Sequence, residues 1–154
     1  ESTEIHPLTY EPNPEDFNER ALLVARVRIH GGAIAVVNGH FSWVPAINRR
    51  NVDEALALLA RLDAPAILAG DLNAPPDSAG MQRLRDSGWI DAWAVLRDGD
   101  AGYTFEADAP QQRIDYIWLH PQLAPRLRAI DVVSGRGDDG ARLSDHYGLI
   151  ATFE

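Results

Sequence analysis

The sequence contains no cysteine, and this absence excludes disulfide bonds, thiolate metal sites and a cysteine nucleophile. It also contains no apolar run long enough to cross a bilayer, and no signal-peptide pattern opens it. These absences leave the compartment open between cytoplasmic and secreted. At 154 residues and 45% hydrophobic content, the chain has the size and composition of one soluble globular domain, or of a piece of one.

Basic residues are also scarce. The chain has 14 Lys and Arg residues against 23 Asp and Glu residues, which gives a formal net charge of −9. A surface of this sign repels a phosphate backbone unless a local basic patch or bound cations intervene. Because the sequence shows no Lys/Arg cluster, we expect no indiscriminate nucleic-acid binding, although a metal-dependent nuclease stays compatible with it.

Apolar runs predict a chain in which strands dominate. Residues 1–18 are polar and proline-containing, which predicts an irregular N-terminal segment. We expect a helix over 46–61, where apolar side chains repeat at helical spacing, and a shorter one between an N-cap at Ser78 and Gly88. Strands are expected at 21–29, 33–37, 66–71, 103–105, 113–119, 126–133 and 147–153. We expect a hairpin turn at 30–32 and a loop at 134–144, and the apolar run at 89–96 is ambiguous between helix and strand. This pattern predicts a mixed or antiparallel sheet.

The stretch from Ala66 to Pro76 contains the first candidate site. A short apolar run ends in Gly-Asp-x-Asn and is stopped by two prolines, which is typical of a buried strand that reaches the rim of a sheet. If the extended conformation persists, the period of two directs Asp71 and Asn73 to the same side. A carboxylate beside a carboxamide suits a water or hard cation together with a phosphoryl oxygen. Taken alone, however, the stretch is as typical of a plain strand-ending turn.

Further polar residues occur at the ends of other predicted strands. His40 follows one strand, Asp115 lies near the start of another, and Asp145 and His146 precede the last one. The strands that carry these residues are those at 33–37, 66–71, 113–119 and 147–153. If the first two run antiparallel to the last two, and residues 126–133 lie between the last two, the ends that carry the polar residues meet at one edge of the sheet. Three aspartates, two histidines and an asparagine at one rim indicate a functional site.

Each of these residues also has a structural explanation. A lone His40 is more often a surface or satisfied core histidine, and Ser144-Asp145-His146 in isolation is typical of turn and cap chemistry. Asp115 interrupts an apolar run, and a buried carboxylate needs a partner, which a pairing with Arg113 would supply. For the six residues together the functional interpretation is favoured, because independent turn residues would not be expected to meet at one rim of the sheet.

With these residues in hand, the sequence resembles the DNase I-like endonuclease/exonuclease/phosphatase superfamily. Three motifs in order carry the resemblance, namely Gly70-Asp71-Leu72-Asn73, Arg113-Ile114-Asp115-Tyr116 and Ser144-Asp145-His146, and Asn38-Gly39-His40 is similar to the family's Asn-Thr-His strand end. The resemblance runs from about Glu19 to the C-terminus. It implies an α/β (α+β) fold, a DNase I-like β-sandwich of two packed sheets flanked by helices. It also implies Mg²⁺-dependent hydrolysis of phosphate esters, with Mn²⁺ as an alternative ion.

The resemblance also implies roles for individual residues. Asp71 would position and deprotonate the attacking water, and Asn73 would hold that water or a phosphoryl oxygen. His40 would donate to a non-bridging oxygen as charge builds there. Asp115 would orient and charge-stabilise His146, which acts on the phosphate or as a base. These roles agree with the basicity that a histidine gains from a carboxylate partner.

The resemblance implies a metal site at Asp145 and Asp71. The sequence also differs from the family's pattern at several positions. Gly39 stands where the family has Thr, and Gly148 stands where it has Pro. The family's N-terminal part normally supplies an Asn and a Glu that is the principal metal ligand, and nothing before Glu19 matches either. We therefore expect residues 19–154 to be the C-terminal portion of the domain, with a sheet face or edge left uncovered.

Two classes of function follow. The first is a phosphatase or phosphodiesterase acting on a small or lipidic phosphate ester. A metal-dependent endo- or exonuclease is the alternative, and the negative net charge favours the small or lipidic substrate over a nucleic acid. The second is a non-catalytic half-domain that needs a complementary N-terminal segment or a second copy in a homodimer.

Overall fold

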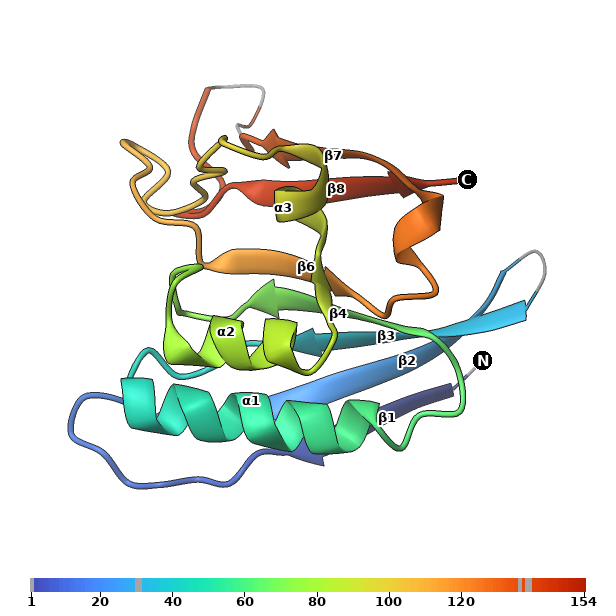
Figure 1. Ribbon diagram of the computed structural model, residues 1–154. Helices are drawn as coiled ribbons and strands as arrows, with labels where there is room; N and C mark the ends of the chain where they lie inside the picture. Colours follow the sequence, from blue (N-terminus) through green and yellow to red (C-terminus); the bar gives the residue numbers. More distant parts are fainter. Residues whose placement is uncertain (1, 30–31, 136, 138–139) are drawn as a thin grey trace.

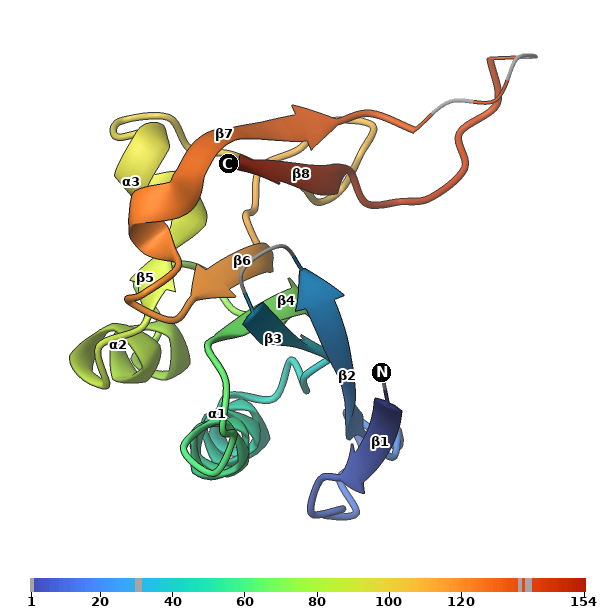
Figure 2. The same cartoon turned by 90° about the vertical axis from the view of Figure 1, so that its right-hand side faces the viewer.

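The computed structural model describes residues 2–29, 32–135, 137 and 140–154, and its elements form layers (Figure 1). The larger sheet has six strands, in the spatial order β1 (Ser2–Pro7), β2 (Ala21–Ile29), β3 (Gly32–Gly39), β4 (Ala66–Asp71), β6 (Asp115–Leu119) and β5 (Ile90–Asp91). Helices α1 (Pro45–Leu59) and α2 (Ala79–Asp86) cover one face of it. The smaller sheet of β7 (Leu127–Val133) and β8 (Gly148–Phe153) packs over part of the other face (Figure 2).

Two cores hold these layers together. Leu22 and Val24 of β2 alternate with outward residues and face the helices, where they join Leu68, Trp118 and other buried side chains. The second core lies between the two sheets and contains Ile130 of β7, together with Trp93 of the short helix α3 (Ala92–Leu96). The predicted mixed α/β fold, two packed sheets flanked by helices, is confirmed. None of the helices in the described part of the chain is both long and apolar enough to span a bilayer.

The local signals located most elements correctly. Ser78 caps α2, because its hydroxyl oxygen accepts from the backbone N–H of Met81 at 3.3 Å, and Gly88 follows the helix with a φ of 86°. Strand β7 is preceded by a 3₁₀ turn, η1 (Ala124–Arg126), so it begins one residue later than expected. The ambiguous run at 89–96 divides into β5 and α3. The predicted hairpin turn includes residues 30 and 31, which lie outside the described residues.

Three expectations were wrong. The N-terminal segment was predicted to be irregular, but residues 2–7 form β1, which pairs antiparallel with β2. Tyr103-Thr104-Phe105 was predicted to be a strand, but it forms no strand and makes isolated bridges at Phe105 to Gln112 and His146. Residues 126–133 were expected between the last two site-bearing strands, but β7 pairs with β8 in a separate sheet and β6 belongs to the larger one.

Candidate active site

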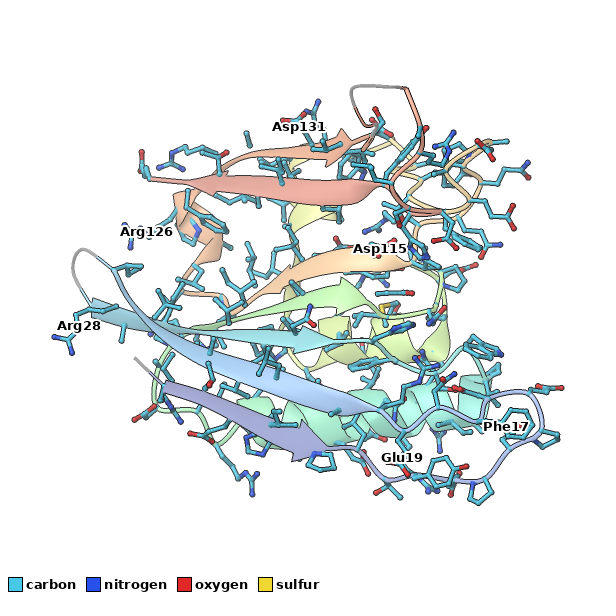
Figure 3. All side chains as sticks on the ribbon, turned by 180° about the vertical axis from the view of Figure 1, so that it is seen from behind. Phe17, Glu19, Arg28, Asp115, Arg126 and Asp131 are labelled. Atoms are coloured by element: carbon cyan, nitrogen blue, oxygen red, sulfur yellow. The ribbon has the colours of Figure 1, made fainter. Side chains whose placement is uncertain are left out.

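Strand order brings the predicted site residues to one rim. Strands β3 and β4 are parallel, with Asn38 opposite Ala69, so both end at the same edge. Strand β6 runs antiparallel to β4, and Asp71 at the end of β4 lies directly opposite Asp115 at the start of β6. The predicted antiparallel relationship therefore holds for this pair of strands. Figure 3 shows Asp115 at this end of the larger sheet, with Arg28 and Arg126 toward the other end.

Glycine at position 70 allows the two strand ends to approach closely. A Cβ atom on Gly70 would lie 2.1 Å from the carbonyl oxygen of Gly39, and the φ of Gly70 is 139°. Both conditions exclude a larger residue. Just beyond, the backbone N–H of Phe41 donates to the carbonyl oxygen of Asp71 at 2.9 Å. The residues that follow β3 are thereby tied to the end of β4, beside the Asp71 side chain.

Asn73 is positioned by a turn rather than by an extended strand. Strand β4 ends at Asp71, and Asn73 has a φ of 48°, in the left-handed region that asparagine tolerates. Its backbone N–H donates to Oδ1 of Asp71 at 2.8 Å, and its side-chain Nδ2 donates to the carbonyl oxygen of Phe41 at 2.8 Å. The backbone of Asn73 is therefore bound to the Asp71 carboxylate, although the extended conformation on which the sequence argument depended does not persist.

His146 is held against Asp115. Its Nδ1 atom lies 2.8 Å from Oδ2 of Asp115, and because an ionised carboxylate only accepts, Nδ1 carries the proton of this bond. Arg113 is not the partner of Asp115. Its guanidinium forms two hydrogen bonds, of 3.0 and 2.9 Å, with the buried carboxylate of Asp91. The ring of Phe105 packs against the imidazole with 4.8 Å between ring centroids.

The carboxylate of Asp71 lies between two imidazoles. Its Oδ2 atom is 3.3 Å from Nε2 of His40 and 3.9 Å from Nε2 of His146. Burial raises the pKa of Asp71, and the charge of Asp115 adds to this, while the Asn73 N–H and the two imidazoles oppose it. Burial by itself lowers the pKa of His146, but the hydrogen bond and charge of Asp115 outweigh it, so the pKa is raised overall.

Three of these side chains offer a metal site. One ligand atom each from Asp71, Asp115 and His146 lie within 4.8 Å of one another. Two carboxylates fit Mg²⁺, which needs only one or two protein carboxylates because water and substrate phosphate complete its coordination. Within the described residues, Asp145 is not part of this convergent group; its Oδ1 lies 3.5 Å from the hydroxyl of Ser144. Its predicted role as a metal ligand therefore stays a prediction.

Two buried residues to which the sequence analysis gave no role support the rim. Asn48 of α1 donates from Nδ2 to the carbonyl oxygens of Ser42 and Leu72, both at 2.7 Å, and so joins the segments that follow β3 and β4. The Tyr116 hydroxyl lies 2.6 Å from the carbonyl oxygen of Ala74. The sequence offered one signal for Asn48, which is a polar residue on the apolar face of the predicted helix.

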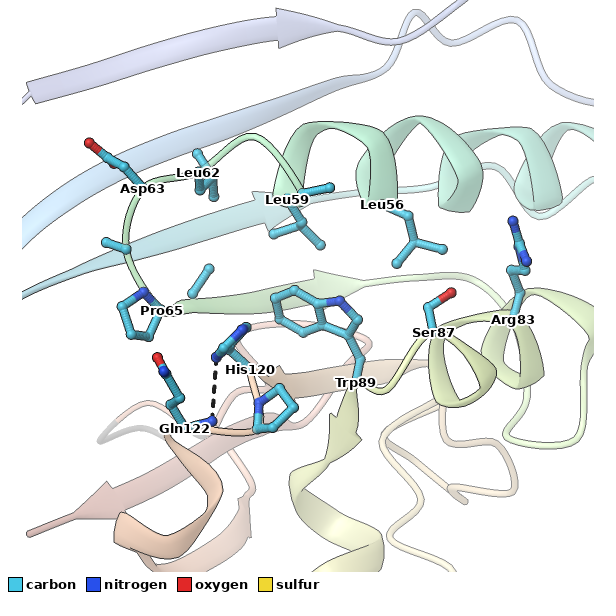
Figure 4. A pocket seen from close by; sticks show the side chains of 14 residues that line it. Leu56, Leu59, Leu62, Asp63, Pro65, Arg83, Ser87, Trp89, His120 and Gln122 are labelled. Atoms are coloured by element: carbon cyan, nitrogen blue, oxygen red, sulfur yellow. Dashed lines mark hydrogen bonds between the residues drawn. The ribbon is translucent and has the colours of Figure 1, made fainter.

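A large cavity lies away from this rim. It has a volume of about 700 Å³ and is formed at the end of α1, the start of β4 and the turn after β6, with Trp89 and His120 in its wall (Figure 4). Its charged residues are already paired, Arg83 with Asp53 at 3.0 Å and Asp63 with Arg26 at 2.6 Å. The convergent ionisable groups Asp71, Asp115 and His146 lie at the rim and not in this cavity.

Known proteins with this fold agree with the architecture. Residues 2–146 match the model of a family described as the Endonuclease/Exonuclease/phosphatase family, so the match begins well before Glu19. A Bacteroides vulgatus endonuclease/exonuclease/phosphatase superimposes with a TM-score of 0.79 at 20% identity, covering 99% of this chain and 65% of that one. D. rerio TDP2, complexed with a single-strand DNA product, gives 0.78 at 21% identity, covering 99% and 67%. Comparison with curated protein sequences gave no match.

Proposed function

The chain belongs to the endonuclease/exonuclease/phosphatase family, and from that premise we propose that its rim hydrolyses phosphate esters with the help of a divalent metal ion. The observation that carries the proposal is the position of Asp71, whose carboxylate lies 3.3 Å from His40 and 3.9 Å from His146. A carboxylate between two imidazoles, one of them oriented by a second carboxylate, is equipped for proton transfer and for stabilising charge on a phosphoryl group.

Asp71 is the general base of this proposal. Its raised pKa brings the carboxylate closer to the range in which it can take a proton from water. Asn73 holds the water or a phosphoryl oxygen, because one hydrogen of its Nδ2 is already donated to Phe41 and the other, together with Oδ1, is left for a ligand. We propose that both residues act on the same water, because the backbone N–H of Asn73 is hydrogen-bonded to the Asp71 carboxylate.

The two histidines act on the phosphate. With Nδ1 of His146 donating to Asp115, its Nε2 faces Asp71 and is the atom that accepts or donates a proton. His40 donates to a non-bridging oxygen, where negative charge builds in the transition state. Asp115 stabilises the protonated form of His146, which agrees with the raised pKa of that imidazole.

Mg²⁺ is the proposed ion, and Asp71 and Asp115 are the carboxylates that would hold it, with Asp145 as a further candidate. When bound, such an ion neutralises charge on the phosphoryl oxygens. Mn²⁺, which accepts the same hard oxygen ligands, would serve as an alternative.

The proposed substrate is a small or lipidic phosphate ester. A net charge of −9 opposes the approach of a long polyanion but hardly affects a single phosphate that pairs with a local cation. A nuclease is the second candidate, and it is supported by the structural likeness to D. rerio TDP2, which was solved with a single-strand DNA product.

An incomplete domain is the remaining candidate. Ile5 of the edge strand β1 is 71% exposed and pairs with the exposed Leu23 on the sheet face opposite α1, and Ile29 is exposed on the same face. Such a face is covered in a complete sandwich. A second copy or a complementary segment would cover it, and sedimentation would then detect a dimer or a second polypeptide. A compact monomer with full activity would exclude this candidate.

The test of the catalytic proposal is hydrolysis of bis(p-nitrophenyl) phosphate. We expect Mg²⁺-dependent turnover that disappears with EDTA and with Asp71→Asn. Asp77→Asn is the matched control, because Asp77 is exposed, lies six positions away and loses the same charge. Asp77→Asn should keep the turnover. Turnover that survives Asp71→Asn would overturn the assignment of Asp71.

A further inference from the structure

Trp43 is exposed in a protein that buries its other tryptophans. It is 46% exposed, whereas Trp89, Trp93 and Trp118 are at most 9% exposed. Indole is the largest side chain that can contribute to a core, so an exposed one is informative. Trp43 lies three residues after His40 in the sequence, which limits the separation of their Cα atoms to about 11 Å.

An arginine holds one face of this indole. The guanidinium carbon of Arg20 is 5.3 Å from the Trp43 ring centroid, within the range of a cation–π contact. Arg20 is itself fixed, since its side chain is only 7% exposed and its Nη2 donates to both carboxylate oxygens of Asp16, at 3.1 and 2.9 Å. Its Nη1 also donates to the carbonyl oxygen of His40 at 3.3 Å. The same guanidinium therefore contacts both the indole and the backbone of a site residue.

The backbone on either side of Trp43 is also ordered. The N–H of Ser42 donates to Oδ1 of Asn51 at 3.0 Å, and the N–H of Val44 donates to the Ser42 hydroxyl at 3.1 Å. Both Ser42 and Asn51 are buried. The indole is therefore exposed on a rigid segment, and a ligand that stacks on it has little conformational entropy to remove.

We propose that Trp43, backed by Arg20, is a stacking platform for a planar ring of the substrate whose phosphate is bound at the His40–Asp71 rim. This rests on the proposed function and names its substrate class: a small phosphate ester that carries an aromatic ring, as a nucleotide does. A flat π-system is the chemistry that an indole recognises best, and it places no further negative charge on an acidic protein. A nucleobase lies one sugar ring away from its phosphate, which suits a platform a few residues from His40.

Two ligands that differ only in the ring test the proposal. AMP and ribose 5-phosphate share the sugar phosphate, and only AMP has a base. With the whole chain in buffer containing EDTA, in which the proposed hydrolysis does not proceed, we expect AMP to quench tryptophan fluorescence and to bind at least about fivefold more tightly than ribose 5-phosphate in calorimetry. Equal affinity for the two ligands, or no binding of AMP, would overturn the platform.

Substitutions at Trp43 locate the effect. Trp43→Ala should weaken AMP binding about fivefold or more and leave ribose 5-phosphate unchanged, whereas Trp43→Phe should keep most of the preference but lose the quenching. Phe17→Ala, which removes another exposed aromatic ring from a loop at this end of the molecule (Figure 3), should change neither affinity. Equal weakening of both ligands by Trp43→Ala would contradict ring recognition, as would no weakening of either.

These measurements do not depend on catalysis. If AMP binding requires Trp43 but bis(p-nitrophenyl) phosphate is not hydrolysed, the proposed function fails and the platform stands. If that ester is hydrolysed with dependence on Asp71 but AMP binding ignores Trp43, only the platform fails. Circular dichroism of each variant shows whether a loss of binding reflects a loss of folding.

Discussion

The Nδ1 atom of His146 lies 2.8 Å from Oδ2 of Asp115, although the two residues are 31 positions apart in the chain. Asp115 sits at the start of β6 in the larger sheet, and His146 just precedes β8 in the smaller one. This pair therefore links the two sheets at the rim where Asp71 ends β4. Its contribution can be measured without any substrate.

We expect Asp115→Asn to lower the pKa of His146 in metal-free protein, because the hydrogen bond and the charge that raise it are both weakened. The measurement is an NMR titration of the imidazole in EDTA. Asp145→Asn is the comparison, since Asp145 acts on His146 through its charge alone and more weakly than Asp115 does. A pKa that responds equally to both substitutions would contradict the special role of Asp115.

The same shift has a consequence for stability. A histidine whose pKa is raised on folding stabilises the fold below its ordinary pKa, and this stabilisation is lost as pH rises through the folded-state pKa. Asp115→Asn should therefore reduce the free energy of unfolding more at about pH 5 than at about pH 9. Urea unfolding of both proteins at the two pH values measures this difference.

Asn48 is expected to position the site. Removing its carboxamide with Asn48→Ala leaves the carbonyl oxygens of Ser42 and Leu72 without that partner, so the free energy of unfolding should fall by about 1–3 kcal/mol. The segments that carry His40 and Asn73 should also separate, so kcat for bis(p-nitrophenyl) phosphate should fall. Arg49→Ala, at the exposed next position of α1, is the control. Full activity in a destabilised Asn48→Ala protein would limit this residue to a structural role.

Alanine substitutions at Gly70 and Gly88 distinguish the cost of steric crowding from the cost of backbone strain. Both have positive φ, but a Cβ atom at Gly70 would lie 2.1 Å from the Gly39 carbonyl oxygen, whereas nothing lies within 4 Å of one at Gly88. Gly88→Ala should cost about 1 kcal/mol of stability from strain alone. Gly70→Ala should cost roughly 4 kcal/mol or more, or prevent folding. Thermal melts would show the difference, and similar melting temperatures would refute the proposed close contact.

Asp16 makes stability depend on pH in the opposite sense to His146. Burial alone would raise its pKa, but hydrogen bonds from Ser42, Asn18 and Arg20 outweigh it and lower the pKa to about 2. Because the folded-state pKa is depressed, this stabilisation is present above the ordinary aspartate value and is lost as pH falls toward 2. Asp16→Asn should cost about 1–3 kcal/mol near pH 7 and progressively less in acid. Glu15→Gln, at an exposed neighbour, should cost little at any pH.

Local patterns in the sequence were sufficient for most of the helices and strands. Apolar alternation and runs located β2, β3, β4 and β8, and Ser78 and Gly88 bracketed α2, because these signals act within a few residues. The first strand was missed because its side chains are mostly exposed and show no alternation. It is held by backbone pairing with β2 rather than by burial.

The sequence by itself determined which polar residues reach strand ends, since chain direction and side-chain periodicity place His40, Asp71 and Asp115 there. Only the tertiary structure decided their partners. Arg113 is two residues from Asp115 but pairs with Asp91, and Asp115 instead meets His146, which precedes β8 of the other sheet. Asn48 joins two segments that lie 24 and 6 positions away from it. Hydrogen bonds depend on distance in space, and that distance is set only when the sheets and helices pack.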